Sequence, residues 1–269
     1  ASLNLANSTL DVGQLYIEAR AFAEASDVGQ TGGIANGGST RLEYGGATQV
    51  DTNLISISSN AQTSSGGSAA AGSTLLQGAA GSQAVINTAV LNISGDASGG
   101  SPGTQANAAG RFLVDLGGGN VNAGTMLVTA LGDAIIGDPP ASQLIAQGGN
   151  LNVAGQLDVS AYDDIQIITG AGSIIGSQPV AATTTAITVT SRGGIEITDD
   201  NSGGISLGGQ TISINAGRSI LLDANLAVGN GTVDLLANLA GMLPPPSGPA
   251  GPAAITMAQG SSINAGTGT

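Results

Sequence analysis

The sequence contains no cysteine, histidine, tryptophan or lysine, and these absences exclude several kinds of chemistry. Without histidine a Ser-His-Asp triad cannot form, and without cysteine or lysine there is neither a thiol nucleophile nor a Schiff-base amine. Zinc and iron sites built from His or Cys are excluded for the same reason. Carboxylate chemistry, calcium binding and a purely structural role remain.

Positive charge is scarce as well. Five basic residues stand against 18 acidic ones, which gives a net charge of −13. Nucleic-acid binding depends on neutralising phosphates with basic side chains, so we expect no nucleic-acid partner. No apolar run approaches the roughly 20 residues of a membrane-spanning helix, so we expect no membrane-spanning segment. The basic residues are the arginines Arg20, Arg41, Arg111, Arg192 and Arg218.

The chain is rich in glycine and small polar residues, with Leu, Ile and Val in short clusters. It has 45 glycines, yet 41% of its residues are hydrophobic. A disordered chain combines low hydrophobicity with high net charge, so this one is expected to bury a core. With two Phe and no Trp, that core must be thin and aliphatic.

A short phrase recurs along the sequence: an apolar residue, Asn, a small residue and usually Gly. A longer stretch, residues 3–12, is similar in sequence to residues 151–159. Periodicity of this kind is typical of repeat architectures. The copies of the phrase are Val121-Asn122-Ala123-Gly124, Ile214-Asn215-Ala216-Gly217, Ile263-Asn264-Ala265-Gly266, Leu91-Asn92-Ile93-Ser94-Gly95 and Asn152-Val153-Ala154-Gly155.

Around these phrases apolar and polar residues alternate, as in Ile195-Glu196-Ile197 and Ile212-Ser213-Ile214. Alternation over a few residues, ended by Gly, Asn or Asp, predicts short strands bounded by turns. The best helical candidate, residues 14–25, also alternates and is predicted to be a strand.

We predict an all-β fold, a right-handed parallel β-helix with variable loop insertions between rungs. Each rung would pair with its neighbours, and stacking would bury a narrow aliphatic core. The Asn side chains would stack inside the coil. At a spacing of roughly 4.8 Å, about nine rungs would form a rod about 45 Å long.

The repeating blocks and the insertions between them can be placed on the sequence. Blocks begin near Arg41, Thr74, Arg111, Gln143, Thr185, Gln210 and Ala254. Insertions, expected on one side of the molecule, are residues 24–40, 61–73, 97–110, 176–184 and 237–253.

The alternative fold is an antiparallel sandwich or barrel. It is favoured only by Asn230-Gly231, a pair of residues typical of a hairpin turn. The pattern is already present at Leu3 and is still present at Ile263, with no cap visible at either end. We therefore predict that residues 1–269 form a single β-solenoid segment, part of a longer array or of a head-to-tail assembly.

The carboxylate doublets Asp163-Asp164 and Asp199-Asp200 are the candidates for an enzyme. Polysaccharide-cleaving β-helix enzymes use paired carboxylates as general acid and base. Asp is also favoured at turns, and neighbouring residues of a strand point to opposite faces. We therefore predict turn residues, no catalytic residues and no enzymatic activity.

Calcium and a flat binding face are the other candidates. Gly117–Asn122 resembles a calcium-binding Gly-Gly-x-Gly-x-Asp turn, with Asn in place of the Asp. Asp133, Asp138 and Asp223 are candidates for opportunistic ion binding, but most of these acids are expected only to be solvated at the surface. We predict no cofactor and at most weakly bound calcium. Thr183–Thr190 resembles the row of threonines on an ice- or carbohydrate-binding solenoid. Threonine is also common in strands because it is β-branched, and this accounts for the stretch equally well. Arg41 and Arg111 open equivalent blocks, which indicates a repeated structural role.

Residues 208–237, which run from Gly-Gly-Gln-Thr-Ile-Ser-Ile-Asn-Ala-Gly to Thr-Val-Asp-Leu-Leu-Ala, carry a family resemblance. This stretch, and residues 41–266 more loosely, resembles filamentous-haemagglutinin-type (two-partner secretion) exoproteins. Members of that family are right-handed β-helix proteins of Gram-negative bacteria. The resemblance implies an extracellular or outer-surface location and a role in adhesion, aggregation or biofilm formation.

Together these observations predict a non-enzymatic structural or adhesive protein, a segment of a secreted or cell-surface β-solenoid fibre. Its partners would be further copies of itself or cell-surface glycans and proteins. The alternatives are a polysaccharide-cleaving β-helix enzyme and an ice- or carbohydrate-binding solenoid.

Overall fold

The computed structural model describes the chain except for residues 25–32, 65–66, 100–106, 133–140, 171, 177–185, 200–205, 240–252 and 268–269. The described residues form 26 strands and no helix. All the strand pairings given for them are parallel, as in β1 with β5 and β10 with β14. The prediction of stacked parallel strands is confirmed, and the antiparallel alternative is wrong.

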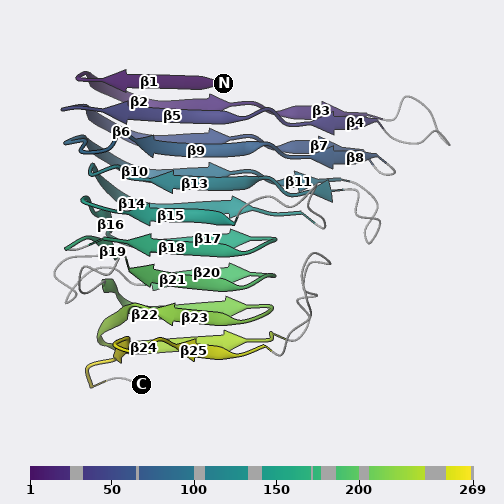
Figure 1. Ribbon diagram of the computed structural model, residues 1–269. Coiled ribbons are helices and arrows are strands. Elements are labelled where there is room, and N and C mark those ends of the chain that lie inside the picture. Colours follow the sequence, from purple (N-terminus) through teal and green to yellow (C-terminus); the bar gives the residue numbers. More distant parts are fainter. Residues whose placement is uncertain are drawn as a thin grey trace.

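Two large sheets make up most of the molecule (Figure 1). Sheet A contains β1 (Ser2–Ala6), β5 (Thr40–Gly45), β9 (Ser73–Gly78), β13 (Arg111–Asp115), β15 (Ser142–Ala146), β18 (Ile165–Thr169), β21 (Ile195–Asp199), β23 (Ile220–Asp223) and β25 (Ile255–Met257). Sheet B contains β2 (Thr9–Glu18), β6 (Gln49–Ser58), β10 (Val85–Ser94), β14 (Asn120–Ala130), β16 (Leu151–Val153), β17 (Gln156–Ala161), β19 (Ile174–Gly176), β20 (Ala186–Ser191), β22 (Ser206–Ala216), β24 (Asn225–Ala237) and β26 (Ser262–Asn264).

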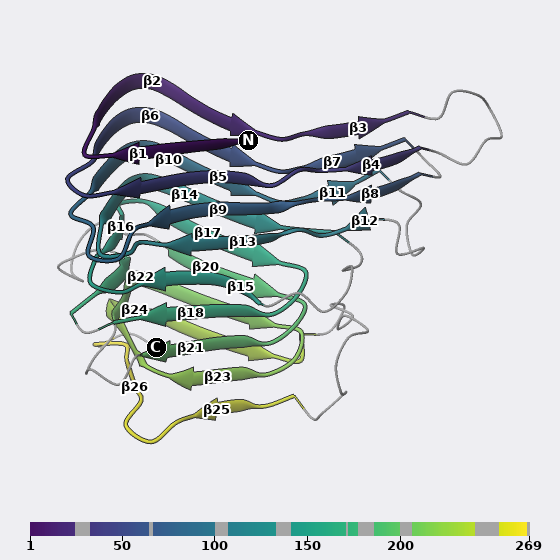
Figure 2. The same cartoon turned by 45° about the horizontal axis from the view of Figure 1, so that its top comes forward.

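Two small sheets extend from the first three passages of the chain. Sheet C consists of β3 (Ala21–Ala23), β7 (Ala61–Thr63) and β11 (Ala97–Ser98), and sheet D of β4 (Ile34–Asn36), β8 (Ser68–Ala70) and β12 (Asn107–Ala108). We call these six strands the alanine wing. Figure 2 shows the wing projecting from the side of the two large sheets.

The chain passes through sheet A, then sheet B and then back to sheet A, and we call each such passage a circuit. Each strand of sheet A pairs with the strand of the next circuit, so nine circuits are stacked. The circuits differ in length: partners are 39 residues apart for Ser2 and Arg41 but 23 for Ser142 and Ile165. The N-terminal and C-terminal strands lie at opposite ends of the stack (Figure 1).

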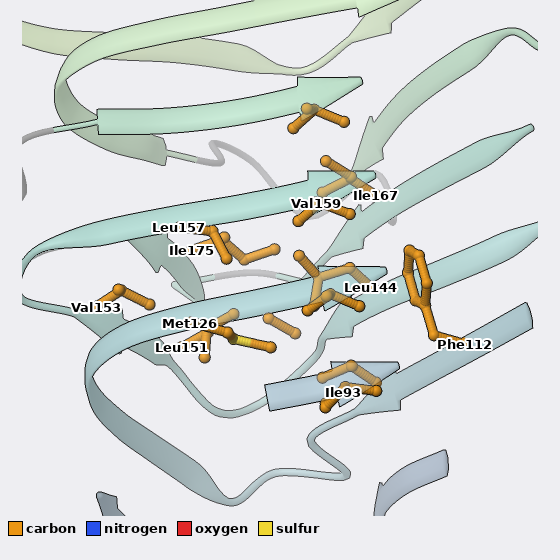
Figure 3. Packing of buried hydrophobic residues seen from close by; sticks show 14 of the residues in the cluster. Ile93, Phe112, Met126, Leu144, Leu151, Val153, Leu157, Val159, Ile167 and Ile175 are labelled. Carbon is orange, nitrogen blue, oxygen red and sulfur yellow. The ribbon is translucent and has the colours of Figure 1, made fainter. Parts of the chain in front are cut away.

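The core lies between sheets A and B and follows from strand alternation. In β13 the side chains of Phe112 and Val114 are buried, whereas their neighbours are half-buried on the outer face. Figure 3 shows Phe112 and other buried side chains, such as Met126, Leu144 and Ile167, layered along the stack. Burying one such Leu, Ile or Val side chain contributes about 1.5–3 kcal/mol, so the core is the main source of stability.

The long strands of sheet B bend in the middle, and the first and second halves present different outer faces. In β10 the buried residues are Ile86 and Thr88 before the bend and Leu91 and Ile93 after it. Before the exposed Ala89 the even-numbered side chains point into the core, and after it the odd-numbered ones do. In the fifth and sixth circuits the two halves are separate strands, β16 with β17 and β19 with β20, whereas β22 and β24 again run through both halves.

The predicted repeat positions are correct in part. Strands of sheet A begin at or within one residue of Arg41, Thr74, Arg111, Gln143 and Ala254, but Thr185 and Gln210 correspond to sheet B. Starts near Ile165, Ile195 and Ile220 were not predicted. Strands of both sheets alternate in the same way, so alternation alone does not distinguish them.

The predicted insertions and hairpin also need correction. The segments 24–40, 61–73 and 97–110 contain strands of the alanine wing, not loops alone. Four of the five segments connect sheet B to sheet A, whereas 176–184 lies between β19 and β20. Asn230-Gly231 is no hairpin: both residues lie within β24, opposite a register shift of β22.

Candidate functional site

A groove on the outer face of sheet B is the best candidate for a binding site. It has a volume of about 940 Å³ and crosses the first half of the sheet B strands in the first five circuits, with Gly172 and Ile174 of the sixth circuit at its end. One residue from each circuit shares the same register position, which forms a column along the stack. The column consists of Asp11, Asp51, Asn87, Asn122 and Asn152.

Hydrogen bonds join the side chains of this column into a ladder. The Nδ2 of Asn152 donates to the Oδ1 of Asn122 over 2.8 Å, and the Nδ2 of Asn122 donates to the Oδ1 of Asn87 over 2.8 Å. The Nδ2 of Asn87 then donates to the Oδ1 of Asp51 over 2.7 Å. All three bonds point the same way, so the chain of amides ends at a carboxylate. We call these four residues the amide ladder.

The carboxylate at the end of the ladder is held in its ionised form. Hydrogen bonds from Asn87 and, secondarily, from Gln49 lower the pKa of Asp51. The Gln49 Nε2 donates over 2.7 Å to the second carboxylate oxygen. Asp11 occupies the same position in the preceding circuit, so negative charge collects at this end of the groove.

The ladder corrects the prediction that Asn side chains stack inside the coil. Asn87, Asn122 and Asn152 are half-buried and lie on the outer face, while Ile86, Val121 and Leu151 beside them fill the core. An amide inside would displace an aliphatic side chain and need buried partners.

The recurring Asn phrase does not mark one position of the repeat. Asn122, Asn152 and Asn264 share a register column in the first half of sheet B, since β16, β19, β22, β24 and β26 continue the pairing. Asn92 and Asn215 lie in the second half, in strands β10 and β22. The phrase nevertheless was the signal that pointed to the ladder.

A second amide pair supports the edge of the groove. Asn120 Oδ1 accepts from the backbone N–H of Asn150 at 3.1 Å, and Asn150 Oδ1 accepts from the backbone N–H of Ile174 at 2.9 Å. Asn120 belongs to the stretch that resembles a calcium-binding turn. Its side chain and that of Asn122 bond to neighbouring circuits, and Gly117 and Gly118 form the corner with positive φ. This stretch is a structural corner.

The carboxylate doublets do not converge. Asp164 precedes β18, and its Oδ1 accepts from the backbone N–H of Gly194 at 2.7 Å in the next circuit. Asp199 is the last residue of β21 and pairs with Thr169 at the far end of β18, about 16 Å along the strand. Paired catalytic carboxylates in glycosidases lie about 5–9.5 Å apart. Asp200 lies outside the described residues.

The remaining candidate calcium ligands are the acids Asp133, Asp138 and Asp223. Asp223 is exposed at the end of β23, whereas Asp133 and Asp138 lie outside the described residues. Within the described ranges no group of three or more Asp or Glu residues could hold a metal ion. The part of the chain that the structure describes also contains no helix with the length and apolar character of a membrane span.

The threonine stretch lies partly in β20 and forms no uniform ladder. Thr188 is flanked by Asp158 and Ser213 in the adjacent circuits, and Thr190 by Ser160 and Asn215. Residues 183–185 of the stretch lie outside the described residues. The face is polar and built from small side chains, but its columns mix hydroxyl, amide and carboxylate groups.

Arg41 and Arg111 both begin strands of sheet A but are not equivalent. Arg41 pairs with Leu75 in the register, whereas Arg111 pairs with Ser73, two residues earlier. Arg41 forms a 3.0 Å ion pair with Glu43, and the Nε of Arg111 donates to the Ser73 hydroxyl at 3.4 Å. Their roles are structural but different.

A second hollow and a second ladder provide comparisons for the groove. The hollow, of about 1000 Å³, lies at the corner between sheets A and B and is lined by Glu43, Asp115 and small turn residues. On sheet A, Gln143 donates to Gln166 at 2.8 Å, and Gln166 donates to Glu196 at 2.9 Å. The register column in the hollow mixes Asn4, Glu43, Gln77 and Asp115, and the residues of the glutamine ladder line neither the hollow nor the groove.

Comparisons of this chain with protein-family models, curated proteins and solved structures gave no match.

Proposed function

We propose that this chain is a structural and adhesive segment of a secreted or cell-surface fibre, and that its stacked circuits form a right-handed parallel β-solenoid. Crossovers between parallel strands are right-handed in almost all proteins. The observation that carries the proposal is the unbroken pairing of nine circuits along one axis. At roughly 4.8 Å per circuit, the stack forms a rod about 40 Å long.

The two ends of the rod are suited to stacking. Ile255 and Met257 occupy register positions that are buried in preceding circuits, but they are 46% and 45% exposed. In the first circuit Leu3, Leu5 and Leu10 are only partly buried. An unpaired strand edge with apolar side chains is a template for further pairing. Contact between two different ends continues into an open filament.

The chemistry of the described residues supports a non-enzymatic role. The acids that could act as a catalytic pair hold turns or lie far apart, and the chain has no His, Lys or Cys. Net negative charge maintains solubility and opposes sideways association between rods. Partners at the ends are therefore copies or continuations of the same solenoid, and partners at the sides are surface glycans or proteins.

End-to-end association can be tested by placing charge at the last strand. The wild-type chain should form rods in negative-stain images and should associate with rising concentration in analytical ultracentrifugation. The double variant Ile255→Lys/Met257→Lys should remain as single rods, because charge on an edge strand opposes pairing. A wild-type chain that stays monomeric at every concentration would contradict end-to-end association.

The matched control is Thr188→Lys/Ser213→Lys, which introduces the same charge on neighbouring strands at the side of the rod. It should associate like the wild type. Equal behaviour of the end and side variants would contradict association through the ends.

A further inference from the structure

The groove over the amide ladder has the hydrogen-bonding capacity to bind a ligand. A primary amide carries two N–H donors and an oxygen with two lone pairs. Asn122 uses one donor toward Asn87 and one acceptor site toward Asn152. One donor and one acceptor site remain on Asn122, and it lies on the open side of the sheet.

This pair of free groups repeats along the stack. Neighbouring amides are one strand spacing apart, roughly 4.8 Å, so the three amides span about 10 Å, and the whole column from Asp11 to Asn152 spans about 19 Å. The ladder bonds fix the amides in one orientation, so little conformational entropy is lost when a ligand binds. A regular row of donors and acceptors fits a ligand that repeats its own polar groups at a similar interval.

The lining determines the chemical class of that ligand. Among the described residues that line the groove, none is basic and none is aromatic, and its charged members are Asp11 and Asp51. Anionic polymers are repelled from this acidic end. The amides of the ladder and of the exposed Asn53 offer hydrogen bonds to a neutral, hydroxyl-rich chain.

We propose that the groove binds an extended neutral polysaccharide, which runs along the rod axis across the amide ladder. This inference rests on the proposed adhesive function and identifies the glycan that the side of the rod would hold. Alternate sugar hydroxyls would donate to the Asn oxygens and accept from the Asn N–H groups.

Affinity electrophoresis of the full chain in gels with hydroxyethyl cellulose, mixed-linkage β-glucan or galactomannan tests this inference. The wild type should be retarded by at least one of these neutral polymers, and less by carboxymethyl cellulose at the same concentration. Asn122→Ala should weaken binding about tenfold, since it interrupts the ladder at its centre. Wild-type mobility unchanged by every neutral polymer would overturn the inference.

Two further variants separate binding from folding. Ala154→Trp leaves the ladder intact but places a large side chain at an exposed position in the lining, so it should block binding while unfolding at the wild-type urea concentration. Gln166→Ala interrupts the glutamine ladder of sheet A and should bind like the wild type. Equal loss of binding in Gln166→Ala and Asn122→Ala, or full binding by Ala154→Trp, would contradict the groove as the site. Rods that associate end to end without binding any glycan would refute this inference and leave the proposed function standing.

Discussion

The main core and the alanine wing are built on the same parallel pairing, but their side chains differ in size. Between sheets A and B the buried residues are mainly Leu, Ile and Val, together with Phe112, Met126, Tyr44 and several alanines. In the wing the buried cluster consists of Ala35, Ala61, Ala69 and Ala97. Backbone pairing therefore persists whether the layers are wide or narrow, whereas the apolar area buried by each circuit changes greatly.

Glycines beside the wing strand β8 show how closely the layers of the wing approach. A Cβ at Gly72 would collide with the carbonyl oxygen of Gly38 in the preceding circuit, and one at Gly67 would lie 2.6 Å from the Gly33 oxygen. Since stabilisation by burial scales with apolar area, the wing adds little free energy of its own. We infer that the wing depends on the main core, and four predictions test this difference.

The largest expected effect is in the main core. Phe112 is fully buried in β13, and Phe112→Ala should lower the free energy of unfolding by about 3–5 kcal/mol through lost burial and a cavity. Urea denaturation followed by circular dichroism measures this loss. Leu113→Ala on the outer face of the same strand is the control and should cost about 1 kcal/mol or less. Equal losses would show that the core is not the main source of stability.

An enlarged side chain in the wing should have a smaller and local effect. Ala69 is fully buried between Ala35 and Asn107 in the neighbouring circuits, and Ala69→Leu should cost about 1–3 kcal/mol by overpacking. Hydrogen exchange should accelerate in β7 and β8 and remain unchanged in β13 and β15.

The control for this change is Ala70→Leu, on the opposite face of β8, where a half-buried side chain can extend outward. Its exchange pattern should match the wild type. Accelerated exchange throughout sheet A in Ala69→Leu would mean that the wing and the core unfold together.

A hydroxyl network joins the two regions. The buried Ser59 hydroxyl lies 2.7 Å from both the Gly72 carbonyl oxygen and the Thr74 hydroxyl, and Thr74 donates to the Ser94 carbonyl at 2.9 Å. Ser59→Ala should cost about 1 kcal/mol, because a buried acceptor loses its donor. Thermal unfolding measures the change, and Ser56→Ala on the outer face of β6 should be neutral. A neutral Ser59→Ala would exclude a role for the network at this junction.

The smallest change in the free energy of unfolding is expected at Asp96, between β10 and the wing strand β11. Unlike the three substitutions above, a change here should not destabilise the protein. Burial raises the pKa of this carboxyl, against hydrogen bonds from the Thr129 hydroxyl at 2.7 Å and the Leu131 N–H at 2.8 Å. Asp96→Asn retains groups for both bonds and removes the charge. At pH 7 it should therefore be neutral or slightly stabilising.

The direction of this pKa shift determines how the contribution of Asp96 to stability changes with pH. Because the folded pKa of Asp96 is above the unfolded value of about 3.9, the folded state binds more protons between these two pKa values. The contribution of Asp96 to stability therefore falls as pH rises through that interval. Urea unfolding of the wild type and Asp96→Asn between pH 3 and 7 should show the variant gaining relative stability as pH rises. A relative loss with rising pH would contradict a raised pKa.

Much of the architecture could be predicted from local patterns. Alternation in segments such as Ile195–Ile197 predicted strands with one buried face, and the structure confirms it. Asp163-Asp164 were predicted to be turn residues, and Asp164 caps the backbone of the next circuit. The alanine wing could not be predicted, because Ala, Gly and Ser give little hydrophobic contrast over two or three residues.

The groove depends on information that no local pattern contains. Asn87, Asn122 and Asn152 are 35 and 30 residues apart in the sequence, and circuits of unequal length conceal their common register. The same phrase occurs around Asn92 and Asn215, which lie in the other half of sheet B. Only the pairing of whole strands shows which Asn side chains meet.

The absence of Lys, His and Cys by itself excluded the chemistry of those side chains, and the alternation of aliphatic with small polar residues by itself predicted strands around a thin aliphatic core. Each of those features acts on a single residue or on its near neighbours, so the sequence contains it directly. Register, the bend of sheet B and the outward direction of the amide ladder arise from contacts between circuits. These long-range contacts exist only in the folded stack, and therefore the tertiary structure decided where the groove and the amide ladder lie.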